Sequence, residues 1–293
     1  MSETNRRIAD RLDEAARLLS EQGANPFRVS AYRRAAETLR HETEDAAALL
    51  EAGGPERLEA LPGIGRSLAA AIAEMVRTGR WAQLERLRGE ADPEAAFRTV
   101  PGIGPALARR IHDHLGVDSL EALEVAAHDG RLEAVPGVGR RRAAMLRGAL
   151  AEMLARTRPA RRRDGGERPD RGEEPSVAVL LDVDREYRDR AGQGDLPRIA
   201  PRRFNPSGEA WLAILHTQRG DWHFTALYSN TARAHDLDRI GDWVVIYFHH
   251  DDAPEGQRTV VTDTRGTLTG RRVVRGREAE CRAAYESERA PAP

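Results

Sequence analysis

The amino-acid sequence predicts a multidomain protein with an all-α N-terminal half and a β-rich α+β C-terminal half. A pattern of an apolar residue, Pro, Gly, an apolar residue and Gly occurs three times before residue 155, and each copy leads into a helix-forming run. Beyond residue 175 the apolar residues instead follow the two-residue alternation of β-strands. These two observations divide the chain into two halves of different fold class.

The repeated pattern is typical of a tight turn between two helices, which we call a hairpin. Its copies occupy residues 61–65, 100–104 and 135–139. Glycine permits the backbone conformations and close approaches that such a turn requires. Amide groups at the start of the following helix then form a site for a phosphate oxygen. Three such sites in series indicate a protein that holds the backbone of a nucleic acid.

Residues 1–90 predict a compact unit of four helices that contains the first hairpin. Apolar residues recur at helical spacing over 5–21. An Asn-Pro pair, which favours a helix start, predicts a second helix over about 26–40. A glycine pair at 53–54 ends a third, short helix, and the helix of the hairpin runs over 66–78 until the next glycine.

Residues 91–155 predict a second helical unit with the other two hairpins, whose glycines lie 35 positions apart. The segment over 119–130 predicts one or two connecting helices. Two hairpins joined in this way can adopt rough two-fold symmetry. Such a pair could contact both backbones of a duplex.

Residues 156–175 predict a flexible linker, because they combine low hydrophobicity, three prolines and mixed charge. Residues 176–293 predict a β-rich α+β domain of unknown role, with two antiparallel hairpins of strands. The expected strands are 177–181, 211–216, 222–228, 243–249, 258–263 and 271–274, followed by a helix over about 278–289.

Composition limits the compartment and the chemistry. A single cysteine, Cys281, excludes an intramolecular disulfide framework and favours a reducing cytoplasm. The sequence contains no apolar run of membrane-spanning length and no export leader, so we expect a cytoplasmic, nucleoid-associated protein without a membrane partner. It also contains no lysine, which excludes lysine-dependent lyase and ligase mechanisms and leaves arginine as the phosphate-binding side chain.

Charge does not by itself indicate nucleic-acid binding. Residues 1–155 contain 22 arginines and 24 acidic residues, a net charge of −2, whereas nucleic-acid modules usually have a basic excess. Binding must therefore depend on local arginines that follow the second and third hairpins. The alternative is that these charges form a solvated helix face. The arginines are Arg109, Arg110, Arg140, Arg141, Arg142 and Arg147.

Residues 25–36 read Asn-Pro-Phe-Arg-Val-Ser-Ala-Tyr-Arg-Arg-Ala-Ala. Together with the three hairpins, they resemble the N-terminal region of bacterial family X DNA polymerases, which are DNA polymerase beta-like, over residues 1 to about 155. The resemblance implies a small helical domain that binds the 5′-phosphate side of a DNA gap and a hairpin pair that holds the neighbouring duplex. It places Arg28, Tyr32 and Arg33 in the phosphate pocket. Core packing is the alternative role for Tyr32.

The resemblance does not extend to the catalytic centres of that family. Ala71 occupies the position of the lyase lysine, six residues after the second glycine of the first hairpin. The Gly-Ser element and the three metal-binding aspartates of the polymerase palm are not found. Asp182 and Asp184 form an isolated Asp-Val-Asp pair, and the alternative to a metal site is the polar end of a short strand. We expect no lyase activity and no cofactor.

The C-terminal domain contains a second set of candidate site residues. His223 and Thr225 alternate with Trp222 and Phe224, so part of the set is expected on one face of the sheet. Such a set could form a zinc or nuclease site, and the alternative is histidines at exposed strand ends. The segment 198–204 is basic and carries an aromatic residue. It could stack on and neutralise the end of a DNA strand, or it could form a solvated loop. The set comprises His216, Asp221, His223, Asn230, His235, His249, His250, Asp251 and Asp252.

These observations predict a sequence-independent, noncatalytic DNA-binding protein that acts in repair at gapped, nicked or broken DNA. One alternative is an enzyme that processes DNA ends, a metal-dependent nuclease or transferase with its site in the C-terminal domain. Another is a scaffold that recruits a repair polymerase or ligase. The residues expected to contact DNA are Arg28, Tyr32, Arg33, Gly63, Ile64, Gly65, Arg66, Gly102, Ile103, Gly104, Arg109, Gly137, Val138, Gly139, Arg140 and Arg141.

Overall fold

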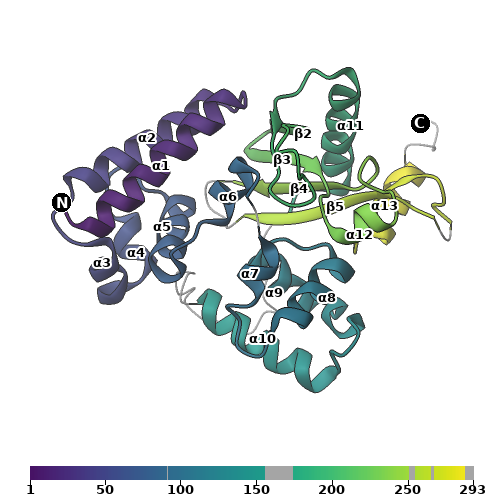
Figure 1. Ribbon diagram of the computed structural model, residues 1–293, viewed down its shortest axis with the longest axis horizontal. Coiled ribbons are helices and arrows are strands. Elements are labelled where there is room, and N and C mark those ends of the chain that lie inside the picture. The colour runs from purple at the N-terminus through teal and green to yellow at the C-terminus, as the bar shows by residue number, and fades with distance from the viewer. Residues whose placement is uncertain (91, 156–173, 251–254, 265–266, 288–293) are drawn as a thin grey trace.

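The computed structural model describes residues 1–90, 92–155, 174–250, 255–264 and 267–287. In this part of the chain the N-terminal half is helical and the C-terminal half contains a six-stranded sheet flanked by helices (Figure 1). The expected fold class is therefore confirmed. Most of the expected linker, residues 156–173, lies outside the described residues. No described helix is both long enough and apolar enough to cross a membrane.

The first helical unit pairs two long helices over a bundle of shorter ones. The side chain of Ser2 caps the first helix, and the side chain of Asn25, followed by Pro26, caps the second, as the Asn-Pro pair predicts. Two short helices were not predicted. The helices are α1 (Glu3–Glu21), α2 (Pro26–His41), α3 (Ala46–Gly53), α4 (Pro55–Glu59), α5 (Arg66–Thr78) and α6 (Ala82–Arg88).

The second helical unit, here called the tandem unit, contains the other two hairpins. Its core gathers Phe97, Leu123 and Leu146 from three different helices. The connection between the hairpins forms one α-helix within the expected segment 119–130, and a 3-10 helix follows it over Arg131–Ala134. The elements are α7 (Pro93–Phe97), α8 (Pro105–Leu115), α9 (Leu120–His128), η1 (Arg131–Ala134) and α10 (Arg140–Ala155).

The C-terminal unit is an antiparallel meander in which each strand pairs with the next along the chain. Five of the six expected strands are present with small shifts at their ends. The short first strand and one helix between strands were not predicted. The strands are β1 (Arg198–Ile199), β2 (Leu212–Arg219), β3 (Trp222–Tyr228), β4 (Val244–His249), β5 (Gly256–Thr262) and β6 (Arg272–Val274), and the helices are α11 (Val177–Gln193), α12 (Ala232–Asp236) and α13 (Glu278–Ser287).

The expected strand over 177–181 is wrong, because these residues begin α11. The Ser176 hydroxyl caps this helix by accepting from the amide of Val179. Buried residues then recur at Leu180, Val183 and Tyr187, which is helical spacing. A five-residue apolar run fits a buried strand or one face of a helix equally well, and only the residues beyond it distinguish the two.

Asp182 and Asp184 therefore lie on a helix and not at the end of a strand. Residues two positions apart on a helix do not share a face. The Asp184 carboxylate is buried, with 1% of its side chain exposed, and pairs with Arg272 (2.6 Å) and Arg188 (3.1 Å). Asp182 is 38% exposed and pairs with Arg219 at 2.8 Å. Both carboxylates thus form separate ion pairs with arginines.

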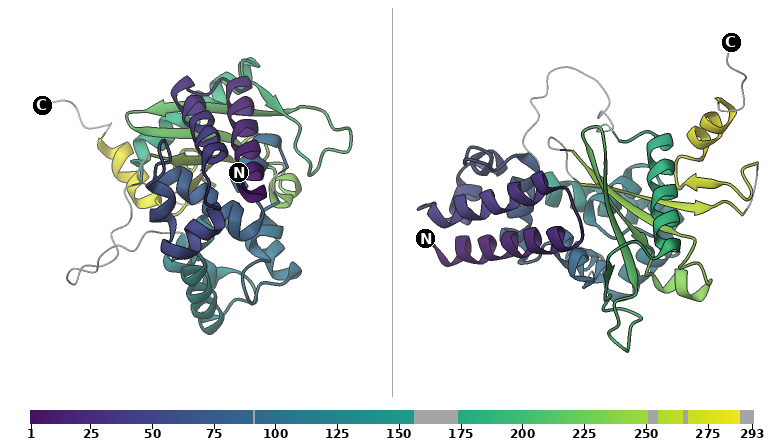
Figure 2. Two further views of the ribbon diagram at one scale, coloured as in Figure 1. Left: turned by 90° about the vertical axis from the view of Figure 1, so that its left-hand side faces the viewer. Right: turned by 90° about the horizontal axis from the view of Figure 1, so that it is seen from above.

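The sheet lies between helices on both faces. Figure 2 shows the α1–α2 pair on one side of the strands and α11 on the other. One face is apolar and packs against α11 and α13. Opposite this face, Ile199, Leu212 and Ile214 belong to the same hydrophobic cluster as the core of the first helical unit. The remaining side chains of this second face are mostly polar, and we call it the polar face.

Replacement of Asp184 by Asn is expected to lower the free energy of unfolding by about 3–5 kcal/mol, because it leaves charged arginines beside a buried neutral amide. Urea unfolding followed by tryptophan fluorescence measures this change. Asp182→Asn is the matched control and is expected to cost about 1 kcal/mol or less, because its carboxylate is partly solvated. Equal stability of the two variants would contradict the assignment.

Candidate nucleic-acid interface

The three hairpins share one turn geometry. The first glycine of each has a positive φ, +75° at Gly63, +89° at Gly102 and +82° at Gly137, which favours glycine. In each turn the amide of the next residue donates to a carbonyl three residues earlier, with N···O distances of 2.9–3.1 Å. The side chains at that next position, Ile64, Ile103 and Val138, are buried and anchor the turn.

The second glycine of each hairpin has no such requirement. Gly65 and Gly104 have φ values of −81° and −87° with extended ψ, which any residue adopts. A Cβ atom added at Gly65, Gly104 or Gly139 would meet no atom within 4 Å. No side chain caps α5 or α8. Each of these glycines therefore leaves open space in front of the first amides of a helix.

The two hairpins of the tandem unit face each other with reciprocal contacts. A Cβ at Gly102 would lie 2.7 Å from Cε of Met145, and a Cβ at Gly137 would lie 3.3 Å from Nη1 of Arg110. Each contacting residue is eight positions after the first glycine of its own hairpin. Arg142 donates to the carbonyls of both glycines, at 3.1 and 3.5 Å. These contacts agree with the expected two-fold arrangement.

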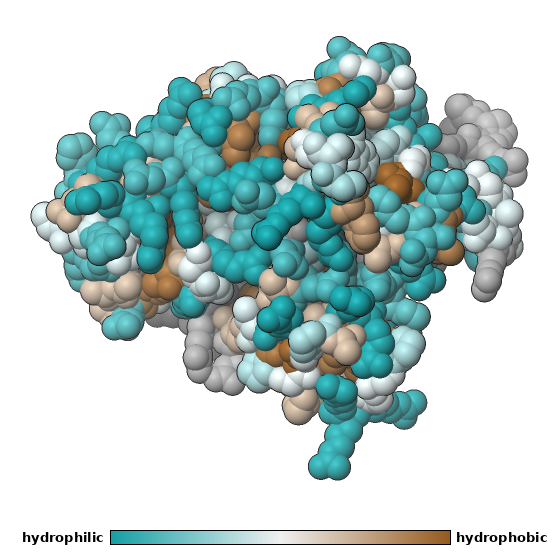
Figure 3. Space-filling model, viewed as in Figure 1, coloured by the Kyte–Doolittle hydropathy of each residue, from teal (hydrophilic) through white to brown (hydrophobic). Residues whose placement is uncertain are grey.

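Exposed arginines surround the hairpins. The side chain of Arg140 is 95% exposed, and Arg66, Arg109 and Arg141 are also exposed. Three of these four have ion pairs to glutamates at 3.7–3.8 Å, which are long and solvated. Figure 3 shows long hydrophilic side chains projecting from the lower edge of the molecule, where Figure 1 places the tandem unit. These side chains can reorient toward an anion.

The three residues of the expected phosphate pocket do not share one environment. Arg33 is exposed. Tyr32 is buried against Trp81, and its hydroxyl donates to Gln83 at 2.9 Å, so it packs in the core. Arg28 is 8% exposed, and its Nε has no hydrogen-bond partner among the described residues. Its guanidinium lies 6.0 Å from the Tyr32 ring centre.

The polar face of the sheet collects several of the candidate residues of the C-terminal domain and presents them to the first helical unit. The two nitrogens of His216 bond to Thr225 and to Gln22, each at 3.0 Å. The His223 and His249 rings stack with centres 5.3 Å apart. Thr225 and His223 thus lie on the face predicted from strand alternation, and this face is an intramolecular contact surface.

The other members of the set lie elsewhere. Asp221 is in the β2–β3 turn, whereas Asn230 and His235 bond to each other near α12. Asp251 and Asp252 lie outside the described residues. Within the described ranges, no three His, Cys, Asp or Glu residues gather in a group that could hold a metal ion.

Two histidines of the polar face have lowered pKa values. Burial, with the nearby charges of Arg28 and Arg86, lowers the pKa of His216 to about 3. Burial and the same two arginines hold the pKa of His249 well below its usual value. Both rings are therefore neutral at neutral pH. Because Gln22 donates its amide to the Leu87 carbonyl, its oxygen accepts from Nε2 of His216, which leaves Nδ1 to accept from Thr225.

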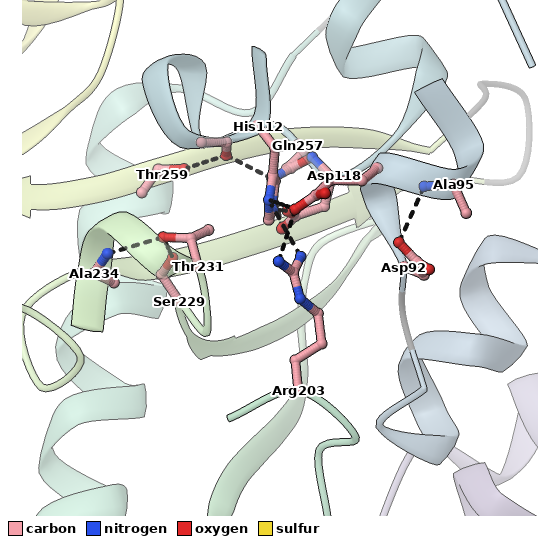
Figure 4. A network of polar contacts seen from close by, with 12 residues as sticks. Asp92, Ala95, His112, Asp118, Arg203, Ser229, Thr231, Ala234, Gln257 and Thr259 are labelled. Atoms are coloured by element: carbon pink, nitrogen blue, oxygen red, sulfur yellow. Dashed lines mark hydrogen bonds and ion pairs between the residues drawn. The ribbon is translucent and has the colours of Figure 1, made fainter. Parts of the chain in front are cut away.

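A buried polar network joins the three units. Arg86 of α6 stacks 3.5 Å from the Tyr247 ring centre and pairs with Glu255 at 2.5 Å. Asp118 of the tandem unit bonds to His112 (2.7 Å) and to the Tyr247 hydroxyl (2.8 Å). Burial raises the pKa of Asp118, but His112, Tyr247 and Arg86 outweigh it and lower the pKa overall. Figure 4 shows His112, Asp118 and Gln257 within this network. No sequence pattern marked these residues.

Comparison with known families agrees with this geometry. Residues 3–81 match the helix-hairpin-helix domain family, and residues 95–152 match the SAM-like helix-hairpin-helix tandem family. The N-terminal half of this protein is therefore built from helix-hairpin-helix domains.

A curated relative extends the comparison. The DNA polymerase/3′-5′ exonuclease PolX of Bacillus subtilis (strain 168) is 28% identical over 143 residues, which are 48% of this chain and 24% of that protein. The resemblance to the helix-hairpin-helix region of a family X polymerase is thus confirmed. The chain matches only about a quarter of the relative's length.

The lowered pKa of buried His216 predicts that the free energy of unfolding decreases in acid. The pKa of His216 is about 3 when folded and 6.5 when unfolded, so the unfolded state binds more protons between these values and stability falls as the pH falls through this range. Between pH 7 and pH 5 this loss is about 2 kcal/mol. In urea unfolding at the two pH values, His216→Gln is expected to lose less stability than the unmodified protein by about this amount. Parallel pH profiles would contradict the buried neutral state.

Proposed function

We propose that this protein binds DNA through its backbone phosphates, without sequence preference, at gaps, nicks or ends. The observation that carries the proposal is the second glycine of each hairpin. Neither backbone conformation nor packing within the described residues requires glycine at Gly65, Gly104 or Gly139. A ligand that approaches the helix start closely would require it, because a Cβ would stand in the way.

The chemistry of these sites favours a phosphate. The first amides of a helix point outward and carry partial positive charge, which suits an anion. Exposed arginines beside the second and third hairpins add charge-assisted donors. Amides and guanidinium groups that contact phosphates carry no information about base sequence. Binding is therefore local and sequence-independent, although the net charge of the helical half is −2.

Preference for interrupted DNA is supported by the arrangement of two separate binding units. The reciprocal contacts of the tandem unit favour binding to the backbones of both strands of a duplex. The first hairpin lies on a different unit. The buried network around Arg86 holds both units against one sheet. The relative that shares this half is a DNA polymerase and exonuclease. A duplex next to a gap, nick or end would offer phosphates to both units.

The resemblance assigns the family's lyase lysine to the position of Ala71, which is buried, and the sequence contains no lysine. We therefore propose a noncatalytic role, in which a repair polymerase or ligase completes the reaction on the DNA that this protein holds. Association with the nucleoid would follow from DNA binding. The alternative, end processing by His223 or Asp221, predicts product from labelled gapped DNA with magnesium, manganese or zinc.

Alanine at Gly104 or Gly139 is expected to weaken binding to duplex DNA by about tenfold per hairpin, because each methyl group displaces a charge-assisted hydrogen bond. Fluorescence anisotropy with labelled DNA of unrelated sequences measures the loss, which should be equal for all of them. The first glycines are unsuitable for this test, because their positive φ makes any substitution strained.

Gly192→Ala is the matched control for the glycine variants. Gly192 lies in α11, far from the hairpins in sequence, and a Cβ there also meets nothing within 4 Å. We expect this variant to bind DNA as the unmodified protein does. If Gly104→Ala and Gly139→Ala also bind normally, the role assigned to the hairpins is wrong.

Affinity is expected to fall with salt. If the hairpins neutralise about two to four phosphates, a plot of log affinity against log salt concentration should have a slope of about −2 to −4. Titrations at several salt concentrations measure this slope. Replacing both Arg140 and Arg141 by Gln should make it less steep by about one to two. A flat response of the unmodified protein would exclude phosphate contacts as the source of affinity.

A further inference from the structure

The segment from Ala200 to Asn205 crosses between the two helical units. Its backbone is fixed on one side by Arg202, whose amide donates to the Gly89 carbonyl at 2.7 Å. It is fixed on the other side by Asn230, whose amide donates to the Arg203 carbonyl at 3.0 Å. These two bonds hold Arg203 and Phe204 in a defined position, although both residues lie in a loop.

Phe204 has an unusual backbone conformation. Its φ is +52°, and only one other non-glycine residue in the described ranges, Asp238, has a positive φ. This region is strained for a bulky L-residue and persists only where the surroundings enforce it. The strain does not serve to bury the ring, because Phe204 is 45% exposed. Packing therefore does not account for the strain, which points to a functional role of the exposed ring.

The Phe204 ring already has one aromatic neighbour. The ring centre of His235 lies 4.3 Å away with the planes 36° apart. Asn230 fixes His235 through a 2.6 Å contact to Nε2, and the same Asn230 holds the Arg203 carbonyl. Burial and Arg203 lower the pKa of His235 more than Asp236 raises it. His235 is therefore a neutral, oriented aromatic ring at neutral pH.

This aromatic pair is tied directly to the tandem unit. Arg203 pairs with Glu94 of α7 at 2.7 Å and reaches Nδ1 of His112 at 3.4 Å, as Figure 4 shows for His112. Glu94 also lies 3.7 Å from Arg109. Arg109 is five residues after Gly104, or about 7.5 Å along the α8 axis. The aromatic pair thus adjoins the helix that begins at the second hairpin.

We propose that Phe204 and His235 form a stacking site for an unpaired base of the DNA strand held by the tandem unit. The inference rests on the proposed function and adds to it a second ligand class, the face of a nucleobase. An exposed aromatic ring beside a phosphate-binding surface is the usual means of holding single-stranded nucleic acid without sequence preference. The Arg203 guanidinium lies 5.4 Å from the Phe204 ring centre, and its ion pair with Glu94 holds it there.

The test compares a blunt duplex with the same duplex that carries a short 5′ or 3′ single-stranded extension, using the full chain. The unmodified protein is expected to bind one of the extended duplexes about tenfold more tightly than the blunt duplex. Phe204→Leu keeps an apolar side chain but removes the aromatic face, so it should lose this preference and bind the blunt duplex unchanged. Phe204→Trp should retain the preference.

Leu237→Ala is the matched control, because Leu237 is an apolar residue at the end of α12 that is 51% exposed. It should bind all the DNAs as the unmodified protein does. A second readout uses 2-aminopurine in the extension, whose fluorescence falls on stacking. The drop should occur with the unmodified protein and with Leu237→Ala, and should be absent with Phe204→Leu.

The proposal is overturned if the unmodified protein prefers neither extension, or if Phe204→Leu keeps both the preference and the fluorescence drop. In either case blunt-duplex binding would remain, and the proposed function with it. Absence of blunt-duplex binding by the unmodified protein would instead overturn both. If Phe204→Leu does not fold, His235→Leu takes its place with the same expected outcomes.

Discussion

The arrangement of this protein depends on a buried guanidinium. Arg86 lies on a helix of the first unit. Its neighbours are nevertheless Tyr247 of β4 and Glu255, which precedes β5, with Asp118 of the tandem unit close by. A buried charge without such partners is costly, so separating these elements would expose several polar groups together. The contacts of Arg86 thus hold the three units together, and the hairpins keep fixed positions relative to one another.

The polar face of the sheet is covered by the first helical unit, and this explains why its histidines are buried. A protein that needed His216 as a metal ligand or a general base would have to leave its nitrogens accessible. Instead both nitrogens have protein partners, and burial keeps the ring neutral. The positions that we propose for ligand binding are open instead: the helix starts behind the second glycines and the exposed ring of Phe204.

Sequence reasoning succeeded where the cause of a structure is local. The three hairpins, the cap at Asn25 and the alternation along β3 each depend on a few neighbouring residues, and each was predicted. It failed over 177–181, where a short apolar run carries no period. It also missed Asp118 and Tyr247, which are 129 positions apart and meet only through folding. The polar face of the sheet was predicted, but nothing local indicates what covers such a face.

The shared core of the first unit affects how this protein can be divided. The composition changes near residue 155, which suggests a natural place to cut the chain. Ile199, Leu212 and Ile214 nevertheless pack in the cluster that includes Leu12 and Leu39. A fragment that stops at residue 155 would lack these three side chains, so the apolar surface of the first unit that packs against them would be exposed to water. The helical half alone is therefore expected to aggregate, and a chain that includes the sheet is the better starting point for crystals or spectra.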